Sequence, residues 1–270
     1  MTETATTGIY VYGVTRLEDA HLLPAGGLAL DPAFPLELVA AGDLVALCSE
    51  IGREAVDLGG GEELEPVERT ARCHAEILDR CLEVDALLPF RLGTVFADRQ
   101  GLRLIIEQSA GDFEAQLARL GGAREWGVKG YVSLERLSEA LVGRDPELDA
   151  LARAAEGDGG AAFFSRRQLA GRLDEQMRNE AEAAAADLHL RISELSRDNR
   201  LNPAQPRQPA RSSDEMILNG AYLLARGSER RLVAAVDEFE AAWGDGGYSV
   251  ELTGPWPPYN FVGGAPTAPA

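Results

Sequence analysis

The spacing of hydrophobic residues alternates between a period of two and a helical period, which predicts short strands interrupted by helices. In the first 122 residues, β-branched and aromatic residues form three short runs, and the Gly42-Asp43 pair between the last two favours a hairpin. Further along, apolar residues recur three and four positions apart, as on one face of a helix. The first predicted elements are strands at 9–14, 36–41 and 44–49 and a helix from Pro66 to about Asp85. The buried stripe of this helix is predicted to consist of Val67, Ala71, His74, Leu78 and Cys81. A turn at Pro89 into a strand follows, and then helices at 98–108 and 112–120.

The chain after Gly121-Gly122 predicts the order strand, long helix, strand, helix, strand, which is close to the ferredoxin-like plan. The alanines at 181–186 on the long helix leave room for another element to approach closely. Residues 199–213 contain three prolines among polar residues and are predicted to form a mobile loop. The predicted elements are strands at 124–133, 215–225 and 248–253, helices at 134–141, 161–197 and 228–243, and a loose acidic stretch before residue 160.

These elements predict an α+β protein of two domains. The first, residues 1–122, is a small α/β sheet domain. The second, residues 123–262, is a ferredoxin-like domain with the long helix, and it ends in a proline-rich aromatic arm at 254–262. Residues 263–270 are predicted to be a disordered tail.

The arm combines three prolines with three aromatic residues. Proline fixes φ and removes a backbone donor, so we expect a stiff segment similar to polyproline II, with about three residues per turn. This period places Trp256 and Tyr259 on one side, with Phe261 close behind. Two roles remain open: the arm folds back onto its own domain, or part of its aromatic face contacts a partner.

The chain is strongly acidic, with a formal net charge of −18. This charge argues against binding to nucleic acid or to an anionic membrane surface. Cys48, Cys73 and Cys81 are odd in number and contain no C-x-x-C pair, as expected for free thiols in a reducing compartment. With no apparent signal peptide and no long apolar run, we expect a soluble cytoplasmic protein.

The sequence offers no arrangement of residues that calls for catalysis. His21, His74 and His189 lack metal-ligand spacing, and we expect His74 to be buried and hydrogen-bonded. There is no phosphate-binding glycine loop. Arg91 stands in an apolar run and is expected to form a structural ion pair or, alternatively, to contact a ligand. We therefore predict no catalytic residue, no metal site and no cofactor.

Several stretches together resemble the gas vesicle GvpL/GvpF family. They occur in the order expected for the family and span almost the whole chain, although Phe90 and Leu92 differ from the residues more common there. The matching stretches are residues 10–13, 88–96, 218–223 and 254–262, with a similar strand at Trp126-Gly127-Val128-Lys129.

This resemblance implies a cytoplasmic accessory protein for gas vesicle assembly that binds the hydrophobic shell protein GvpA or other accessory proteins in a chaperone- or nucleation-like role. It also implies a two-domain α+β fold without catalytic residues or cofactor. Alternatives are a minor structural component of the vesicle shell or a small-ligand-binding ferredoxin-like module. The candidate contact residues are Trp256, Tyr259 and Phe261 in the arm, Asn219 and Tyr222 on the predicted strand 215–225, where a sheet-edge contact is considered, and Arg91. The competing hypothesis makes the arm, the strand and the seam of the long helix part of the core.

Overall fold

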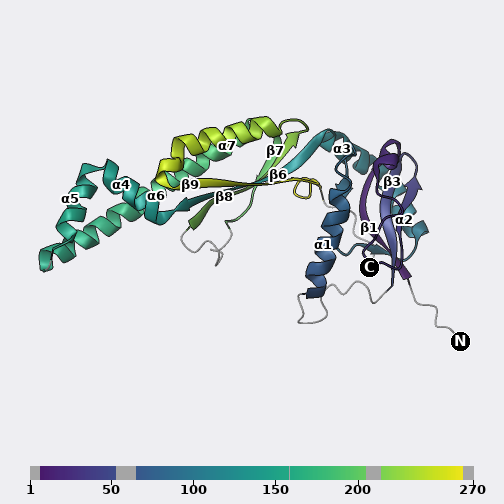
Figure 1. Cartoon of the computed structure of the whole chain (residues 1–270). Helices are drawn as coiled ribbons and strands as arrows, with labels where there is room; N and C mark the ends of the chain where they lie inside the picture. Colours follow the sequence, from purple (N-terminus) through teal and green to yellow (C-terminus); the bar gives the residue numbers. More distant parts are fainter. Residues whose placement is uncertain (1–6, 53–64, 158, 205–213, 264–270) are drawn as a thin grey trace. The chain divides into compact units, whose positions relative to one another are not determined.

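The computed structural model describes residues 7–52, 65–157, 159–204 and 214–263, which form two compact units (Figure 1). The first unit combines the chain up to Glu125 with the chain from Pro255 onward, and the second unit is formed by Trp126–Gly254. The predicted boundary after Gly122 lies close to this division. The predicted arm differs, because from Pro255 onward it belongs to the first unit.

The first unit is an antiparallel sheet with helices on both sides, in the strand order β2-β3-β1-β4, and β5 pairs with β1. In Figure 1, α1 and α2 lie on opposite sides of these strands. The elements are β1 (Thr7–Arg16), the short 3-10 helix η1 (Leu17–Leu22), β2 (Leu36–Ala41), β3 (Leu44–Gly52), α1 (Glu65–Asp79), β4 (Leu88–Pro89), β5 (Val95–Phe96), α2 (Arg99–Gln108) and α3 (Ala110–Leu120).

The predicted hairpin is confirmed, and the predicted stripe is buried at His74, Leu78 and Cys81 but only half-buried at Val67 and Ala71. Gly42 has φ of +60°, a conformation that glycine adopts without steric cost, and the Ala41–Leu44 pair closes the turn. Leu78 and Cys81 pack with Tyr10 and other apolar residues in one buried cluster. Strand β1 therefore supplies the centre of a core that α1 covers.

Two details of this unit differ from the prediction. Helix α1 ends at Asp79, not near Asp85, because the chain then tightens into turns in which Cys81 donates to the Leu78 carbonyl. The predicted turn at Pro89 is also wrong. Pro89 pairs with Gly13 in the sheet, and the chain reverses instead between Arg91 and Thr94, whose N–H donates to the Arg91 carbonyl at 3.1 Å.

The second unit has the order β-α-β-β-α-β, with several helices in the first crossover, and its sheet order is β7-β8-β6-β9. This is the ferredoxin-like arrangement expected from the sequence. The elements are β6 (Ala123–Ser133), α4 (Leu134–Arg144), α5 (Pro146–Ala155), α6 (Gly160–Ser193), β7 (Ser196–Leu201), β8 (Asp214–Ala225), α7 (Glu229–Trp243), the short η3 (Gly244–Gly246) and β9 (Tyr248–Trp256).

Two elements of the second unit were not predicted. Residues expected to be a loose acidic stretch form α5, whose N-terminus is capped by the Asp145 carboxylate, with Pro146 in the first turn. Residues expected to end the long helix and begin a loop form β7, which pairs with β8. β7 is a polar edge strand that lacks an apolar alternation, so its backbone pairing left no signal in the sequence.

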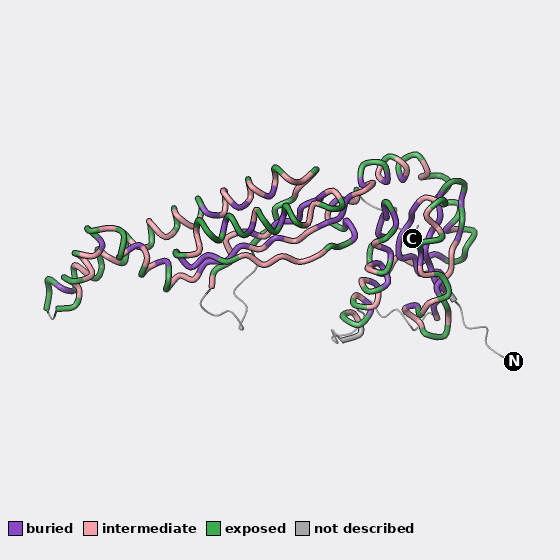
Figure 2. Tube along the Cα trace, turned by 45° about the horizontal axis from the view of Figure 1, so that its top comes forward, coloured by how far each residue is buried: buried purple, intermediate pink, exposed green. Residues whose placement is uncertain are grey.

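The core of the second unit lies between the sheet and the helices. Figure 2 shows buried segments along the strands and more exposed turns toward α5. None of the described helices is both long and apolar enough to cross a membrane. Most of the loop expected at 199–213 and the tail beyond residue 263 lie outside the described residues.

Candidate protein-interaction surface

The proline-rich segment adopts a different backbone from the polyproline-like arm expected from the sequence. Strand β9 continues to Trp256, so Pro255 lies within a strand. Two tight turns follow, in which the Tyr259 N–H donates to the Pro257 carbonyl at 2.8 Å and the Phe261 N–H donates to the Pro258 carbonyl at 3.0 Å. The direction of each side chain is therefore set by these two turns and not by a uniform polyproline helix.

Side chains on both sides of these turns fix the segment to the first unit. Phe261 is fully buried, and its carbonyl accepts a hydrogen bond from Arg119. Asn260 donates twice to the Glu125 carboxylate, from its backbone N–H at 2.8 Å and from its side-chain amide at 2.6 Å. Glu125 is only 5% exposed, so these charge-assisted bonds are formed in a mostly desolvated position.

The two prolines between the anchors fill an apolar hollow in the same unit. Pro257 and Pro258 are buried, and the cavity left beneath them measures about 10 Å³, room for about one water molecule. The other residues that line it are Leu78, Cys81, Leu82, Val84, Ala86, Leu87, Leu120, Ala123 and Arg124. This fit explains why the segment belongs to the first unit.

Trp256 and Tyr259 remain on the surface of this anchored segment, 38% and 39% exposed. Partial burial and then the Asp79 and Glu125 carboxylates raise the pKa of Tyr259, so its hydroxyl stays protonated at neutral pH. The two roles considered for the arm thus divide between its residues. Phe261 belongs to the core, whereas Trp256 and Tyr259 are available for contact.

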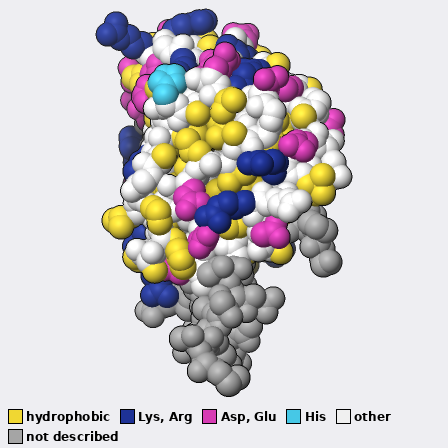
Figure 3. All heavy atoms as spheres, turned by 90° about the vertical axis from the view of Figure 1, so that its right-hand side faces the viewer, with side chains coloured by type: hydrophobic (Ala, Val, Ile, Leu, Met, Phe, Trp, Pro, Cys, Tyr) yellow, Lys and Arg dark blue, Asp and Glu magenta, His cyan; other side chains and the backbone are white. Residues whose placement is uncertain are grey.

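Exposure alone does not mark a binding site. Figure 3 shows a face on which apolar side chains are interspersed with arginines and carboxylates, as is normal for soluble proteins. Trp256 and Tyr259 differ because the backbone that carries them is fixed on both sides. A pair of aromatic side chains on a fixed backbone loses little conformational entropy on binding.

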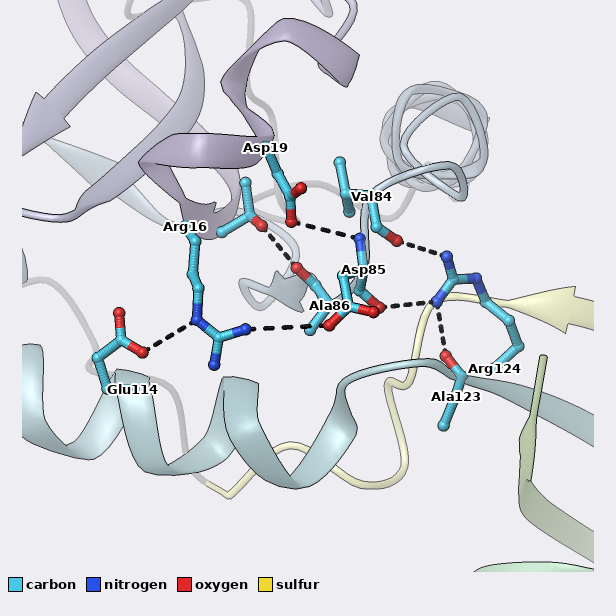
Figure 4. Close-up of polar contacts among 9 residues, drawn as sticks. Arg16, Asp19, Val84, Asp85, Ala86, Glu114, Ala123 and Arg124 are labelled. Carbon is cyan, nitrogen blue, oxygen red and sulfur yellow. Dashed lines mark hydrogen bonds and ion pairs between the residues drawn. The ribbon is translucent and has the colours of Figure 1, made fainter.

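The strand leading out of the first unit is fixed by Arg124, a residue that the sequence analysis missed (Figure 4). Arg124 is 6% exposed, and its guanidinium donates to the carbonyls of Leu82, Val84, Asp85 and Ala123. It therefore satisfies carbonyl groups of the turns that follow α1, as arginine often does near a helix C-terminus.

A second arginine holds the other side of the same turns. Arg16 contacts Glu114 at 3.1 Å and Asp85 at 3.9 Å, and the Thr15 hydroxyl donates to the Ala86 carbonyl at 2.6 Å. Figure 4 shows Arg16 between Glu114 and Asp85, beside the loop from Val84 to Ala86. In the sequence, Arg124 and Glu125 could be noticed only because they stand immediately before the Trp126-Gly127 motif. Their roles could not be predicted, because most of their hydrogen-bond partners are distant in sequence.

Among the described residues, Arg91 does not form the ion pair expected from the sequence. It is exposed, and its guanidinium has no ion-pair or hydrogen-bond partner within the described ranges. It begins a turn in which Gly93 has φ of +82° and donates its N–H to the Tyr10 hydroxyl at 3.3 Å. The turn places Leu92, 37% exposed, next to Arg91 on the surface of the first unit.

Asn219 and Tyr222 lie on β8, between β7 and β6, so the sheet-edge contact considered for this strand is not available there. Tyr222 is fully buried and its hydroxyl is 2.9 Å from His189 Nδ1, whereas Asn219 is half-buried and donates its side-chain amide to the Pro203 carbonyl at 3.0 Å. A Cβ on Gly220 would lie 2.4 Å from the Tyr222 ring, which explains the glycine. Both candidates thus make structural contacts in the second unit.

The prediction that His74 is buried and hydrogen-bonded is confirmed. Its Nδ1 lies 2.8 Å from the Tyr10 hydroxyl, and the residue is 4% exposed. Burial lowers the pKa of His74 to about 4, and the nearby Phe90 backbone opposes this only in part. Nε2 has no partner in hydrogen-bond geometry among the described residues.

This depressed pKa makes a prediction for stability. Between pH 6.5 and about 4 the unfolded chain binds a proton at His74 that the folded chain does not. The free energy of unfolding should therefore decrease as the pH is lowered through this range. The expected loss is about 1.4 kcal/mol per pH unit within that window. Urea denaturation across this pH range should show the slope in the native chain and a smaller slope in His74→Gln. An equal slope in both chains would assign the effect to other groups.

The second unit carries a groove of about 360 Å³ between α6, the end of β6 and the start of β8. Apolar side chains and charged side chains share its lining, which consists of Val132, Leu134, Asp174, Met177, Arg178, Ala181, Glu182, Ala185, Glu215, Met216 and Ile217. Ala181 and Ala185 belong to the alanine run that we expected to leave room beside the long helix. Within the described residues, no group of three or more histidines, cysteines or carboxylates is arranged to hold a metal ion.

Comparison with known proteins gives consistent matches over nearly the full length. The family model of the gas vesicle synthesis protein GvpL/GvpF matches residues 8–263. Gas vesicle protein L of Streptomyces sp. (strain CB03234) is 32% identical over 94% of this chain and 92% of its own length. Gas vesicle protein F of the same strain is 24% identical, with 94% and 98% covered.

Solved structures share the fold. The crystal structure of GvpF from Anabaena sp. PCC7120 superimposes with a TM-score of 0.68 at 16% identity, covering 94% of this chain and 98% of that one. GvpF from Microcystis aeruginosa gives a TM-score of 0.64 at 18% identity, with the same coverage.

Proposed function

The chain belongs to the GvpL/GvpF family of gas vesicle synthesis proteins, and on this premise we propose that it is a non-enzymatic accessory protein that binds the shell protein GvpA during vesicle assembly. Its place of action is the cytoplasm, in association with growing vesicles and with other accessory proteins. The binding surface is the aromatic pair Trp256 and Tyr259.

The observation that carries this proposal is the exposure of two large aromatic side chains on a backbone that the rest of the first unit holds in place. Tryptophan and tyrosine are the residues most enriched among those that dominate binding energy at protein interfaces. A shell subunit with exposed apolar surface needs such a contact, because large apolar patches aggregate in water.

The charge of the chain supports a holding role. At a formal net charge of −18, a complex of the chain with an apolar subunit would carry a large negative charge, which opposes its aggregation. Release would then require only that the growing shell bury more apolar area than the accessory protein does.

The test is capture of GvpA by a tagged copy of the full chain, co-expressed with GvpA. Trp256→Ala together with Tyr259→Ala should reduce capture at least about tenfold, because hot-spot truncations exceed the 1.4 kcal/mol that this factor represents. Leu104→Ala is the matched control, since Leu104 is 51% exposed in the same unit but lies outside the segment.

Circular dichroism should show that all variants remain folded. Undiminished capture by the folded double variant would remove the aromatic pair from the interface. Retention of the chain at a fixed stoichiometry in washed vesicles would instead favour the alternative role of a minor shell component.

The comparison within one strain also supports an assignment to the L branch. The identity to Gas vesicle protein L is 32%, against 24% to Gas vesicle protein F, over the same share of this chain. We infer that complementation of a strain lacking its L protein should restore vesicles better than complementation of a strain lacking its F protein.

A further inference from the structure

Helix α6 has one face against α5 and one face that no described element covers along its N-terminal half. On the side of α5, Arg166 Nε donates to the Ala155 carbonyl at 3.0 Å and Gln176 Nε2 donates to Asp145 at 3.0 Å. At 3.6 residues per turn, Phe164 and Gly171 lie on the other side of the helix. Both are exposed, as Figure 2 shows for much of this end of the unit.

The uncovered face begins with an aromatic pair. Phe163 and Phe164 are 58% and 71% exposed, and their ring centroids lie 6.0 Å apart. Arg167 follows one turn later and is exposed. In this otherwise acidic chain, residues 160–172 contain three arginines and no carboxylate. The first part of the face is thus aromatic and basic.

The same face ends at the groove described above, which has the complementary character. Its apolar lining includes Met177 and Ile217, and its charged residues are three carboxylates and one arginine. The groove therefore combines apolar side chains with a net negative charge, which suits a phenylalanine pair flanked by arginine.

A single chain cannot bring these two surfaces together. Both belong to one continuous helix, and about 16 residues separate the phenylalanine pair from the middle of the groove-lining residues, or about 24 Å along the axis. The aromatic pair of one chain can only reach the groove of another.

Gly171 gives independent support. It lies midway between the phenylalanine pair and the middle of the groove, and a Cβ built on it would meet nothing within 4 Å. Glycine inside a helix costs about 0.5–1 kcal/mol relative to alanine, so the fold of one chain gains nothing from it. Close approach of a second helix at this point would account for the missing side chain.

We propose that two copies of this chain pair antiparallel along α6, crossing at Ala170 and Gly171, so that Phe163 and Phe164 of each copy enter the groove of the other. The contact is isologous, because each chain contributes the same aromatic pair and the same groove. It also places Arg167 of each copy at the groove of its partner, whose net charge is negative. This surface belongs to the second unit and is separate from the proposed contact with GvpA.

Sedimentation equilibrium of the full chain should show a concentration-dependent dimer. Phe163→Gln with Phe164→Gln should raise its dissociation constant at least about tenfold without loss of folding, because both residues are exposed in the single chain. Leu190→Gln is the matched control: Leu190 is 57% exposed on the same helix and outside this face, and the dimer should be unchanged.

Gly171 allows a test with effects of opposite sign. Gly171→Ala should raise the free energy of unfolding of the monomer, because alanine is the better helix former and the space is open, yet it should weaken the dimer. Gly171→Cys should form an intermolecular disulfide under mild oxidation, because an antiparallel crossing at this residue brings it next to its own copy.

A chain that stays monomeric at its highest soluble concentration would overturn the proposal. An unchanged dissociation constant of the dimer in the Phe163→Gln, Phe164→Gln variant would also overturn it. A dimer without the Gly171→Cys cross-link would exclude the antiparallel crossing. If the chain is a monomer and the phenylalanine pair is needed to capture another gas vesicle protein, the face binds that partner. This result would also overturn pairing between copies.

Discussion

Replacing Arg124 with alanine should lower the free energy of unfolding of the first unit by about 4 kcal/mol, since hydrogen bonds to a charged group contribute about 1.5–3 kcal/mol each and do not add fully. The guanidinium donates to four carbonyl groups at a position that is 6% exposed. Alanine would leave those carbonyls without this donor and with little access to water. Few surface substitutions approach this cost.

Hydrogen exchange followed by mass spectrometry is the appropriate measurement, because it separates the two units. The loss of protection should be greatest in peptides that cover residues 80–87 and β1. Arg124→Lys is the matched control: it keeps the charge, but its single ammonium cannot reproduce the fork of donors, so it should recover less than half of the loss. A fully stable Arg124→Lys chain would show that charge alone suffices.

Phe261→Ala should cost about 3–5 kcal/mol, the range for deletion of a buried phenylalanine. The residue is fully buried, and the turns around it are fixed by Asn260 and Arg119. The same change should reduce capture of GvpA, because the backbone that carries Trp256 and Tyr259 loses its anchor.

Urea denaturation should report the loss of stability, and the capture assay should report the loss of binding. Leu28→Ala is the control in the same unit, since Leu28 is 76% exposed and its truncation should change stability by less than about 0.5 kcal/mol. If the Phe261→Ala chain were as stable as the native chain, the segment would not be part of the core. If it were destabilised yet bound GvpA normally, the fixed backbone would not matter for binding.

Local chemistry was sufficient to predict several elements. Gly42-Asp43 predicted the β2–β3 hairpin because few residues accept the backbone of so tight a turn. In the predicted helix 228–243, the helical period placed Leu232, Val236, Phe239 and Trp243 on one face, and the first three are buried in α7 while Trp243 is half-buried. Together with the order of elements, such signals were enough to predict a ferredoxin-like unit.

The candidate surface was predicted only in part. The sequence singled out Trp256, Tyr259 and Phe261 but could not separate the buried residue from the exposed ones, because burial depends on a hollow lined by residues distant in sequence. Arg124 was missed for the same reason. Arg91 gave the opposite error: its apolar neighbours suggested burial, whereas Gly93 turns the chain outward there.

The division of the chain after Glu125 and again before Pro255 has a consequence for synthesis on the ribosome. All of the second unit is translated before the residues that complete the first, and the first cannot close its hollow until Pro257, Pro258 and Phe261 have emerged. The first unit, whose residues are translated first, should therefore be the last to complete its folding. A chain that ends at Gly254 should yield an intact ferredoxin-like unit attached to a first unit with an open core.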